Sequence, residues 1–456
     1  MPLILPATSL VLLLAGPAGP AAQKKAEGTK TEDTQEKAGD KKKKKKDDAQ
    51  KEDGKKEKKP KKSDEYPQFK LDDHPSIHFG KGTHLDFRGR FAADVNSSDA
   101  PDADNTESSA IDLGKKRLGV SGEIVNAVEF QIEAELKRDD PWRDVYAEYK
   151  QFPEVRVRGG QFKIPFSLDE NTGASHLDFM FRSLAATHLA PGRDQGVMVH
   201  GRVVNKAINY EAGVFQHDGK NARTNNPDKV FGGQTIAARV TYEPFRNVKD
   251  AKADLSVGGA YTTSDVPEGI PGLRGLMVFE QPFFSSSQYI VNGKRRRTGV
   301  EFQVLPGPAS VKGEWMRVET ERVGESVEDT DLSPLIGEGW YVSGTYAITG
   351  EKKSRVDRPK KPLFQGGVGA IEVGARIESL EFRSGASGEP GSTSPRADVI
   401  LGNRNQVTTA GVTWYVNRFF KIQANYIHEK LDDPSQGPLP PQATFTTKAV
   451  RFQVSF

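Results

Sequence analysis

The sequence contains no cysteine, which excludes disulfide frameworks, thiolate zinc sites and cysteine nucleophiles. It also lacks the HExxH, GxSxG and P-loop motifs of common hydrolases and nucleotide-binding enzymes. Eight histidines are spread over 456 residues, and His74, His78 and His84 suggest a metal site only faintly. These absences predict that the protein is not an enzyme and has no catalytic residue, no cofactor and no bound metal ion.

A long apolar run is missing as well. Hydrophobic residues make up 35% of the chain and the mean hydropathy is −0.61. No stretch approaches the roughly 20 apolar residues of a transmembrane helix. A membrane crossing would therefore have to use strands, and these would have to form a closed barrel, because only a closed barrel leaves no strand edge unpaired in lipid.

The chain has almost no excess of either charge sign. It carries 65 Lys and Arg against 62 Asp and Glu, for a net charge of +3. Residues 23–65 contain 17 Lys against 12 Asp and Glu, so the rest of the chain carries a net charge of −2. The weak basicity belongs to one segment and does not indicate a nucleic-acid partner.

The first 65 residues form two segments of opposite character. Residues 1–22 carry no charged side chain and include the apolar run LILPATSLVLLLAG, which predicts a signal peptide cleaved near Ala21 or Ala22. Residues 23–65 are charged at 29 of 43 positions and contain no Val, Ile, Leu, Phe or Trp. Such a segment cannot offset the entropy cost of ordering, so we expect a disordered, Lys-rich periplasmic linker. An alternative is that its lysines bind an anionic polymer such as peptidoglycan or lipopolysaccharide.

From residue 66 to 456 the hydrophobic period is two. In residues 128–137 (VEFQIEAELK) apolar and polar side chains alternate strictly, which places them on opposite faces of a strand. The pattern recurs in residues 85–91, 145–149, 155–157, 197–203, 208–214, 236–242, 255–261, 300–304, 340–348, 371–377, 407–415, 420–426 and 450–456. We therefore predict an all-β domain over residues 66–456.

The polar faces of these strands favour a membrane barrel over a soluble sandwich. They carry closely spaced charges, whereas a sandwich usually has shorter strands and a less charged outer face. The longer segments match the ~9–11 residues of a transmembrane strand. Residues 450–456 (VRFQVSF) alternate up to Phe456, which looks like the assembly signal of outer-membrane barrels. The predicted fold is a transmembrane antiparallel β-barrel preceded by a disordered charged segment.

Four segments resemble the phosphate-selective porin O and P family. They are residues 159–168 (GGQFKIPFSL), 177–184 (LDFMFRSL), 189–201 (LAPGRDQGVMVHG) and, less specifically, 413–426 (TWYVNRFFKIQANY). The resemblance extends over roughly residues 79–456. It implies a barrel of sixteen strands, usually trimeric, in the outer membrane of a Gram-negative-type bacterium.

A long connection lies inside the first three segments. Residues 169–193 separate two predicted strands, and connections of that length are usually functional. Folded into the lumen, this connection would narrow the pore with its polar residues His176, Asp178, Arg182, His188, Arg193 and Asp194. The alternatives are an external loop with solvated charges and, for Arg193 and Asp194, an ion pair that holds the loop against the wall.

Anion selectivity requires positive potential along a narrow aqueous path. Alternation places several basic side chains on the inner face of the predicted strands, and others lie on the long connection. The pore-lining or anion-binding candidates are Arg88, Arg90, Arg156, Arg158, Lys163, Arg182, Arg193, Arg202, Arg239 and Arg376, with Lys421 and Arg451 as additional residues. Each is equally compatible with an ordinary lumen ion pair, and the net charge of −2 weighs against strong selectivity. The cluster from Lys294 to Arg297 is expected on a surface loop, binding anions or lipopolysaccharide phosphates.

The sequence therefore predicts an outer-membrane porin for passive diffusion of small hydrophilic solutes, with anions and phosphate favoured. The expected partners are small anionic solutes, outer-membrane lipids and lipopolysaccharide, the barrel-assembly machinery, further copies in a homotrimer, and peptidoglycan through the tail. The alternative is a structural barrel whose lysine-rich tail anchors the outer membrane to the cell wall.

Overall fold

The computed structural model describes residues 66–71, 74–100, 109–136, 141–221, 233–246, 248, 253–269, 272–284, 289–387 and 391–456. The predicted signal peptide (1–22) and linker (23–65) lie outside the described residues. No helix in the described part of the chain is long and apolar enough to cross a membrane.

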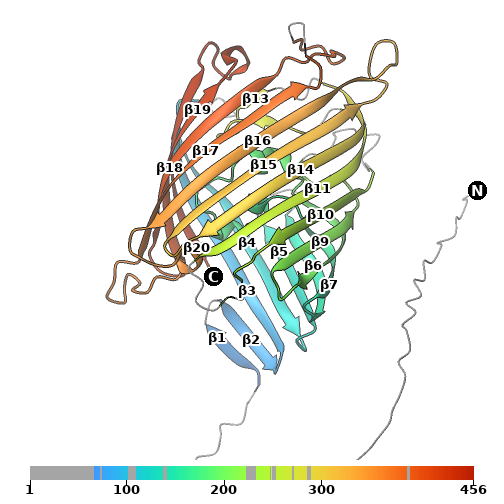
Figure 1. The fold of residues 1–456 in the computed structure, drawn as a ribbon. Coiled ribbons are helices and arrows are strands. Elements are labelled where there is room, and N and C mark those ends of the chain that lie inside the picture. Colours follow the sequence, from blue (N-terminus) through green and yellow to red (C-terminus); the bar gives the residue numbers. More distant parts are fainter. Residues whose placement is uncertain are drawn as a thin grey trace, which may run out of the picture. The chain divides into compact units, whose positions relative to one another are not determined.

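Sixteen antiparallel strands close into a barrel, which confirms the predicted fold (Figure 1). Each strand pairs with its neighbour in sequence, and the last strand, β20, pairs with the first, β3. The sixteen strands are β3 (Thr83–Ser98), β4 (Ser109–Ile124), β5 (Val128–Glu135), β6 (Trp142–Phe152), β7 (Val155–Lys163), β8 (Arg193–Val203), β9 (Ile208–Phe215), β10 (Thr235–Tyr242), β11 (Asp254–Gly269), β14 (Val291–Leu305), β15 (Ala309–Arg322), β16 (Leu332–Ala347), β17 (Ala370–Ser384), β18 (Asn403–Tyr415), β19 (Phe420–Leu431) and β20 (Thr444–Ser455).

The period-two pattern places apolar side chains on the outer face of the strands and polar side chains on the inner face, as the sequence predicted. On β17, Val373 and Ile377 point outward and are exposed, whereas Glu372, Arg376 and Glu378 point inward and are buried. An apolar outer face and a polar interior are the arrangement expected of a barrel surrounded by lipid.

The two ends of the barrel differ in their connections. Short turns such as 125–127, 204–207 and 306–308 lie at one end, which we call the turn end. Longer connections lie at the other end, which we call the loop end, although residues 348–369, with the 3₁₀ turn η3 (Lys353–Arg355), form a long connection at the turn end. A second 3₁₀ turn, η4 (Pro434–Gln436), lies at the loop end.

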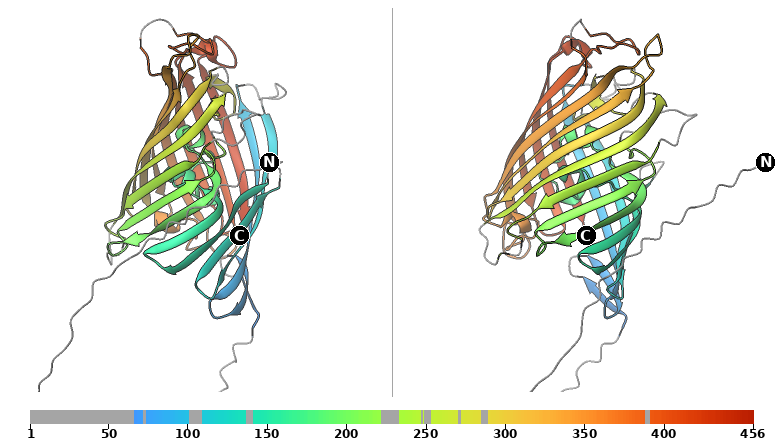
Figure 2. Two further views of the ribbon diagram at one scale, coloured as in Figure 1. Left: turned by 90° about the vertical axis from the view of Figure 1, so that its right-hand side faces the viewer. Right: turned by 45° about the vertical axis from the view of Figure 1, so that its right-hand side comes forward.

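The wall is uneven in height. Strands β5, β9 and β10 have 8 residues each, whereas β14 to β17 have 14 to 16. The short strands lie together on one side of the barrel and the long strands on the other (Figure 2).

The connection between β7 and β8, residues 164–192, folds into the barrel and is called the inner connection. It contains α1 (Leu168–Asn171), the 3₁₀ turn η1 (Ala174–His176) and α2 (Leu184–Leu189). Helix α2 packs against β15, β16 and β17, the long-strand wall. The views in Figure 2 show these short helices surrounded by strands.

A second segment also folds inward. The connection between β11 and β14 contains a small sheet of β12 (Gly275–Leu276) and β13 (Pro282–Phe284). Its Phe283 and Phe284 are buried with Leu189 of α2 and Phe382 of β17, and the rings of Phe284 and Phe382 stack at 4.7 Å. An apolar core therefore fills part of the barrel on the long-strand side.

A hairpin of β1 (Gln68–Leu71) and β2 (Pro75–Gly80) extends the sheet at the turn end. Strand β20 accompanies β3 only down to Arg90, and the backbone of Phe456 then pairs with Gly89 in two hydrogen bonds of 3.0 Å. Closer to the turn end, from Asp86 back to Thr83, β2 pairs with the edge of β3 that β20 leaves free. The hairpin thus covers an edge of β3 that would otherwise be unpaired.

Candidate functional site

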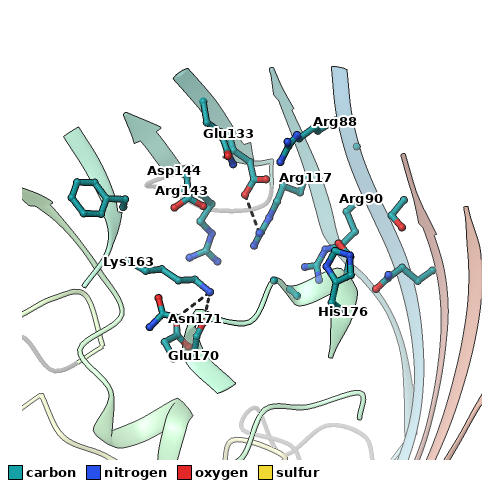
Figure 3. A pocket seen from close by; sticks show the side chains of 18 of the residues that line it. Arg88, Arg90, Arg117, Glu133, Arg143, Asp144, Lys163, Glu170, Asn171 and His176 are labelled. Carbon is teal, nitrogen blue, oxygen red and sulfur yellow. Dashed lines mark hydrogen bonds and ion pairs between the residues drawn. The ribbon is translucent and has the colours of Figure 1, made fainter. Parts of the chain in front are cut away.

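A cavity of about 790 Å³ lies inside the barrel between the inner connection and the short-strand wall. It reaches from the turn end, at Phe420 and Ser455, to the loop end, at Arg193 and Lys220. Figure 3 shows Arg88, Arg90, Arg117 and Arg143 projecting from the wall toward this space, with Glu170 and His176 on the inner connection.

The cavity lining is strongly basic. Twelve Arg and Lys side chains line it against five Asp and Glu. The basic residues are Arg88, Arg90, Arg117, Arg143, Arg158, Lys163, Arg182, Arg193, Lys220, Arg358, Arg418 and Lys421, and the acidic residues are Glu133, Asp144, Glu170, Glu211 and Asp357. The net charge of −2 outside the tail therefore does not describe the cavity.

Six of the ten candidate residues line this cavity. They are Arg88, Arg90, Arg158, Lys163, Arg182 and Arg193. The other four, Arg156, Arg202, Arg239 and Arg376, point inward from the wall but do not reach it. The additional residue Lys421 lines the cavity and Arg451 does not.

Arg88 and Arg90 stand out because no carboxylate of the described residues lies within 4.0 Å of either. Arg90 is 7% exposed, and its Nε atom has no hydrogen-bond partner in the described part of the chain. Lys421 donates to the carbonyl oxygen of Ser175 at 2.9 Å and likewise has no ion-pair partner there. A buried cation without an acidic partner produces a positive electrostatic potential in the space around it.

Four of the other basic residues of the cavity are paired with acids. Arg193 contacts Asp144 at 2.7 Å, and Arg158 contacts Glu148 at 2.5 Å while its guanidinium lies 4.3 Å from the centre of the Tyr146 ring. Lys163 and Arg182 both contact Glu170, at 3.8 and 3.4 Å. These pairs fix the positions of the side chains and reduce their net charge.

The candidates away from the cavity are paired as well. Arg239 lies between Glu211 and Glu301, at 2.8 and 2.5 Å. The partner of Arg202 is Glu243 at 3.1 Å, and the partner of Arg156 is Glu148 at 3.4 Å. Arg376 donates to the carbonyl oxygens of Phe181 and Arg182, at 3.0 and 3.2 Å, and so holds the inner connection.

The prediction that residues 294–297 lie on a surface loop was wrong. They belong to β14, and alternation turns Arg295 and Arg297 inward, where both are fully buried. Each pairs with Asp218, and Arg297 Nε donates to the carbonyl oxygen of Leu189 at 3.0 Å. Burial alone would raise the pKa of Asp218, but Arg297 and Arg295 outweigh it and lower the pKa. Arg297 therefore holds the end of α2, whereas Lys294 and Arg296 point outward and pair with Asp265 and Glu321.

The alternative of an ion pair between Arg193 and Asp194 does not hold either. The two residues begin β8, and each has its partners elsewhere in the chain. Arg193 pairs with Asp144 instead. Asp194 is fully buried and accepts hydrogen bonds from the backbone amides of His217 and Gly219, at 2.9 and 3.2 Å.

The polar residues of the inner connection divide between two sides. His176 and Arg182 line the cavity. Asp178 turns the other way and binds Lys312 at 2.8 Å and Lys353 at 2.7 Å. Burial raises the pKa of the Asp178 carboxyl, but Lys353 and Lys312 outweigh this effect and lower it to about 2. His188 is buried on α2, and desolvation lowers its pKa to about 4.

Five basic cavity residues were missed by the sequence prediction: Arg117, Arg143, Lys220, Arg358 and Arg418. Arg117 precedes the outward-facing Leu118 in β4, so the alternation that identified Arg88 could have found it. Arg358 and Arg418 lie in connections at the turn end and Lys220 follows β9, where no periodic signal exists.

The faint metal site near the hairpin has a different structure. His74 and His84 both contact the carboxylate of Asp86, at 3.3 and 3.4 Å, and the rings of His78 and His84 stack at 5.3 Å. Among the described residues, no three His, Asp or Glu side chains are placed to hold a metal ion.

Comparisons with solved structures show the same fold at low identity. OprB of Pseudomonas putida matches with a TM-score of 0.51 and 11% identity, over 82% of this chain and 94% of that one. The outer-membrane channel DcaP of Acinetobacter baumannii matches with a TM-score of 0.50 and 10% identity, over 82% and 98% of the two chains.

Comparisons of sequence identify the family. An uncharacterised protein of Caulobacter vibrioides is 25% identical over 361 residues, 74% of this chain and 67% of that protein. Porin O of Pseudomonas aeruginosa is 24% identical over 318 residues, 62% of this chain and 67% of that protein. The family model described as phosphate-selective porin O and P matches residues 85–456. Because this match extends over the barrel from β3 to Phe456, the chain belongs to the phosphate-selective porin O and P family.

Proposed function

We propose that the protein is a passive channel for small hydrophilic solutes in the outer membrane of a Gram-negative-type bacterium, with anions favoured over cations and phosphate as a candidate solute. The observation that carries the anion preference is the composition of the cavity, where twelve basic side chains face five acidic ones. Membership in the porin family supports the channel itself.

The preference follows from electrostatics in a confined space. Positive side chains along a narrow aqueous path raise the local concentration of anions and repel cations. Arg88, Arg90 and Lys421 contribute strongly in this proposal, because no carboxylate of the described residues lies within 4.0 Å of them. A guanidinium group also matches two oxygens of a phosphate or carboxylate at once.

Recordings from planar bilayers under a salt gradient test the proposal. We expect discrete conductance steps and a reversal potential of the sign that anion preference gives. In a double variant with Arg88→Gln and Arg90→Gln, the reversal potential should move toward zero. Arg202→Gln, which removes an inward-facing arginine outside the cavity, should leave it unchanged. Absence of conductance would refute the channel, and a cation preference would refute the selectivity alone.

Phosphate is tested in the same recordings. Adding phosphate to a chloride current should reduce that current if phosphate binds in the cavity, and the reduction should weaken in the Arg88 and Arg90 variant. An unchanged chloride current at all phosphate concentrations would leave a general anion channel.

A homotrimer is proposed from the short wall. A strand of 8 residues is roughly 26 Å long and, tilted as in outer-membrane barrels, spans about 20 Å, which is less than the ~30 Å hydrocarbon core. The outward side chains of this wall, among them Val197, Val214 and Ile236, are exposed and apolar. Contact with neighbouring protomers would cover them. Native mass spectrometry of the detergent-solubilised protein should give three copies, and a monomer would refute this assembly.

The linker at residues 23–65 supports a second role, anchoring of the outer membrane to the cell wall, because its 17 Lys match an anionic polymer such as peptidoglycan. Deletion of residues 23–65 separates the two roles. Unchanged conductance with loss of binding to purified peptidoglycan sacculi would support anchoring, and unchanged binding to sacculi would refute it. Its periplasmic location and the involvement of the barrel-assembly machinery stay predictions.

A further inference from the structure

Glu170 on the inner connection is only loosely paired with the cations beside it. Among the described residues, its carboxylate accepts no hydrogen bond, and its contacts are ion pairs of 3.8 Å to Lys163 and 3.4 Å to Arg182. Asp144, another acid of the cavity, instead accepts two hydrogen bonds from Arg193, at 3.1 and 2.7 Å. Hydrogen-bonded ion pairs are shorter and stronger than pairs held by charge alone.

Backbone oxygens also hold the same two cations, independently of that carboxylate. Lys163 Nζ donates to the carbonyl oxygens of Glu170 and Thr172. Arg182 Nη2 donates to the carbonyl oxygen of Thr172 at 2.7 Å. The main chain of Arg182 is held in turn by Arg376, which donates to its carbonyl oxygen at 3.2 Å. The two cations would therefore stay in place if the Glu170 side chain lost its charge.

Helix α1, which carries Glu170, does not need the carboxylate either. The backbone amide of Glu170 donates to Ser167 Oγ at 3.1 Å. Asn171 Nδ2 donates to the carbonyl oxygens of Phe166 and Ser167, both at 2.9 Å. Glu314 accepts from two amides at the start of the helix. The contribution of the Glu170 carboxylate is therefore its negative charge between two cations.

The two cations have a binding capacity that Glu170 does not use. Arg182 Nη1 is buried and has no hydrogen-bond partner in the part of the chain that the structure describes. Lys163 and Arg182 line the cavity with side chains that are 13% and 16% exposed, so water screens them little. Figure 3 shows Lys163 extending from the wall toward Glu170. Ammonium and guanidinium groups are the donors that oxygens of sulfate, phosphate or carboxylate accept.

The charge balance of this place favours an anion. Lys163 and Arg182 against Glu170 give two positive charges and one negative charge, hence a net charge of +1. Displacement of the carboxylate leaves both positive charges without an acidic partner within 4.0 Å among the described residues. The neighbouring Arg193 and Asp144 neutralise each other at 2.7 Å and do not alter this balance.

We propose that Glu170 is a specificity-determining residue of the channel, because its carboxylate occupies, as an internal ligand, an anion site formed by Lys163 and Arg182. This inference rests on the proposed anion-conducting channel. A solute binds at this site only by displacing the carboxylate. Anions with two negative charges are attracted to the two cations more strongly than a single carboxylate is. They displace Glu170, whereas singly charged carboxylates do not.

Chloride currents through the full-length protein in planar bilayers test this role, with sulfate and acetate as the added anions. In the wild type, sulfate should reduce the chloride current at a lower concentration than acetate does. Glu170→Ala removes the internal carboxylate and leaves a space of the same chemistry as acetate. We expect acetate to reduce the current of this variant at a concentration at least tenfold lower than in the wild type, so that the difference between sulfate and acetate narrows.

Two further variants separate charge from shape and position. Glu170→Gln keeps the size of the side chain and removes its charge, so the reversal potential under a salt gradient should move further toward anion preference. Glu243→Gln makes the same change of charge beside Arg202, at a residue that does not line the cavity. This control should keep the reversal potential and both inhibitory concentrations of the wild type.

The outcomes distinguish this role from the channel itself. Equal inhibition of the wild type by sulfate and acetate, equal acetate inhibition of the wild type and Glu170→Ala, or an unchanged reversal potential in Glu170→Gln would each overturn the proposal. A purely structural role of Glu170 predicts lost or noisier conductance without a gain in acetate sensitivity. Absence of any conductance in the wild type would refute the proposed channel, whereas a conducting wild type with unaltered variants would refute only the role of Glu170.

Discussion

The carboxylate of Glu378 on β17 accepts a 2.6 Å hydrogen bond from the backbone amide of Leu184, the first residue of α2. Glu314 on β15 does the same at α1, where it accepts from the amides of Leu168 and Asp169 at 2.8 and 2.6 Å. Each helix also has a serine cap of its own. The wall therefore satisfies amides that a helix start leaves without partners, and the inner connection is attached at both helix starts.

Loss of the Glu314 carboxylate should loosen the inner connection. Glu314→Ala removes the acceptor of two amides and of the Tyr341 hydroxyl. Each buried donor left unsatisfied costs about 1–3 kcal/mol. We expect a larger single-channel conductance with more open-channel noise. Glu319→Ala, an outward position of the same strand, is the control and should behave as wild type; equal noise in the two variants would contradict the anchoring role.

Asp178→Asn should destabilise the protein more than any surface change. The substitution leaves buried Lys312 without an acidic partner among the described residues and Lys353 with Glu372 alone. Breaking one side of a buried ion pair typically costs about 3–5 kcal/mol. Urea unfolding of the refolded barrel, followed by tryptophan fluorescence, measures the loss. A cost below 1 kcal/mol would show that water reaches the two lysines.

Asp178 also determines how the stability of the protein changes in strong acid. The folded-state pKa of Asp178 is lowered to about 2 from an ordinary value of 3.8. Its contribution to stability is therefore fully present above about pH 4 and is lost as the pH falls through 2. The difference in stability between wild type and Asp178→Asn should be constant from pH 7 to pH 4 and shrink only below that range.

His188 should make the barrel sensitive to mildly acidic pH. Its folded-state pKa is lowered to about 4 from 6.5 because it is buried. Between these values the unfolded chain binds a proton that the folded chain does not, so stability falls as the pH drops from 6.5 to 4. His188→Phe should flatten this part of the profile. Melting temperatures measured from pH 7 to 4 decide the matter, and parallel curves for the two proteins would exclude His188 as the cause.

The effect of each cavity arginine on the reversal potential should depend on whether a neighbouring carboxylate neutralises it. Arg158 is paired with Glu148, whereas Arg90 has no carboxylate of the described residues within 4.0 Å. Arg90→Gln should therefore shift the reversal potential by at least twice as much as Arg158→Gln. Measurement at low salt is essential, because a Debye length of ~10 Å at 0.1 M already screens part of the field. A larger effect of Arg158→Gln would refute this ranking.

Alternation in the sequence predicted the barrel and the inward direction of most candidate arginines, although Arg117, Arg295 and Arg297 were not recognised as inward. It assigns a face to each side chain and says nothing about the neighbouring strand. Arg239 and Arg90 look alike in sequence, yet Glu211 and Glu301 neutralise the first, and only the register of β9, β10 and β14 brings these residues together. Periodicity alone therefore cannot predict which arginines are neutralised by acidic residues of neighbouring strands.

The wrong prediction for residues 294–297 and the excluded alternative for Arg193 and Asp194 have a common physical reason. Consecutive charges such as residues 294–297 look like a solvated loop, because burial of a charge is costly without a partner. In the barrel the partner is Asp218, from a connection 77 residues away along the chain. Arg193 and Asp194 likewise found partners in Asp144 and His217. Long-range partners of this kind are invisible in a single sequence.

The pairing of β20 with β3 also determines when the barrel can close during folding. Asp94 and Arg451 form a buried pair at 2.7 Å although 357 residues separate them along the chain. The cylinder cannot be sealed before the whole domain has emerged, and contacts of such separation form slowly. Until that moment one edge of β3 is open, except where β2 already covers it. The N-terminal hairpin therefore reduces the length of exposed edge while the barrel is still open.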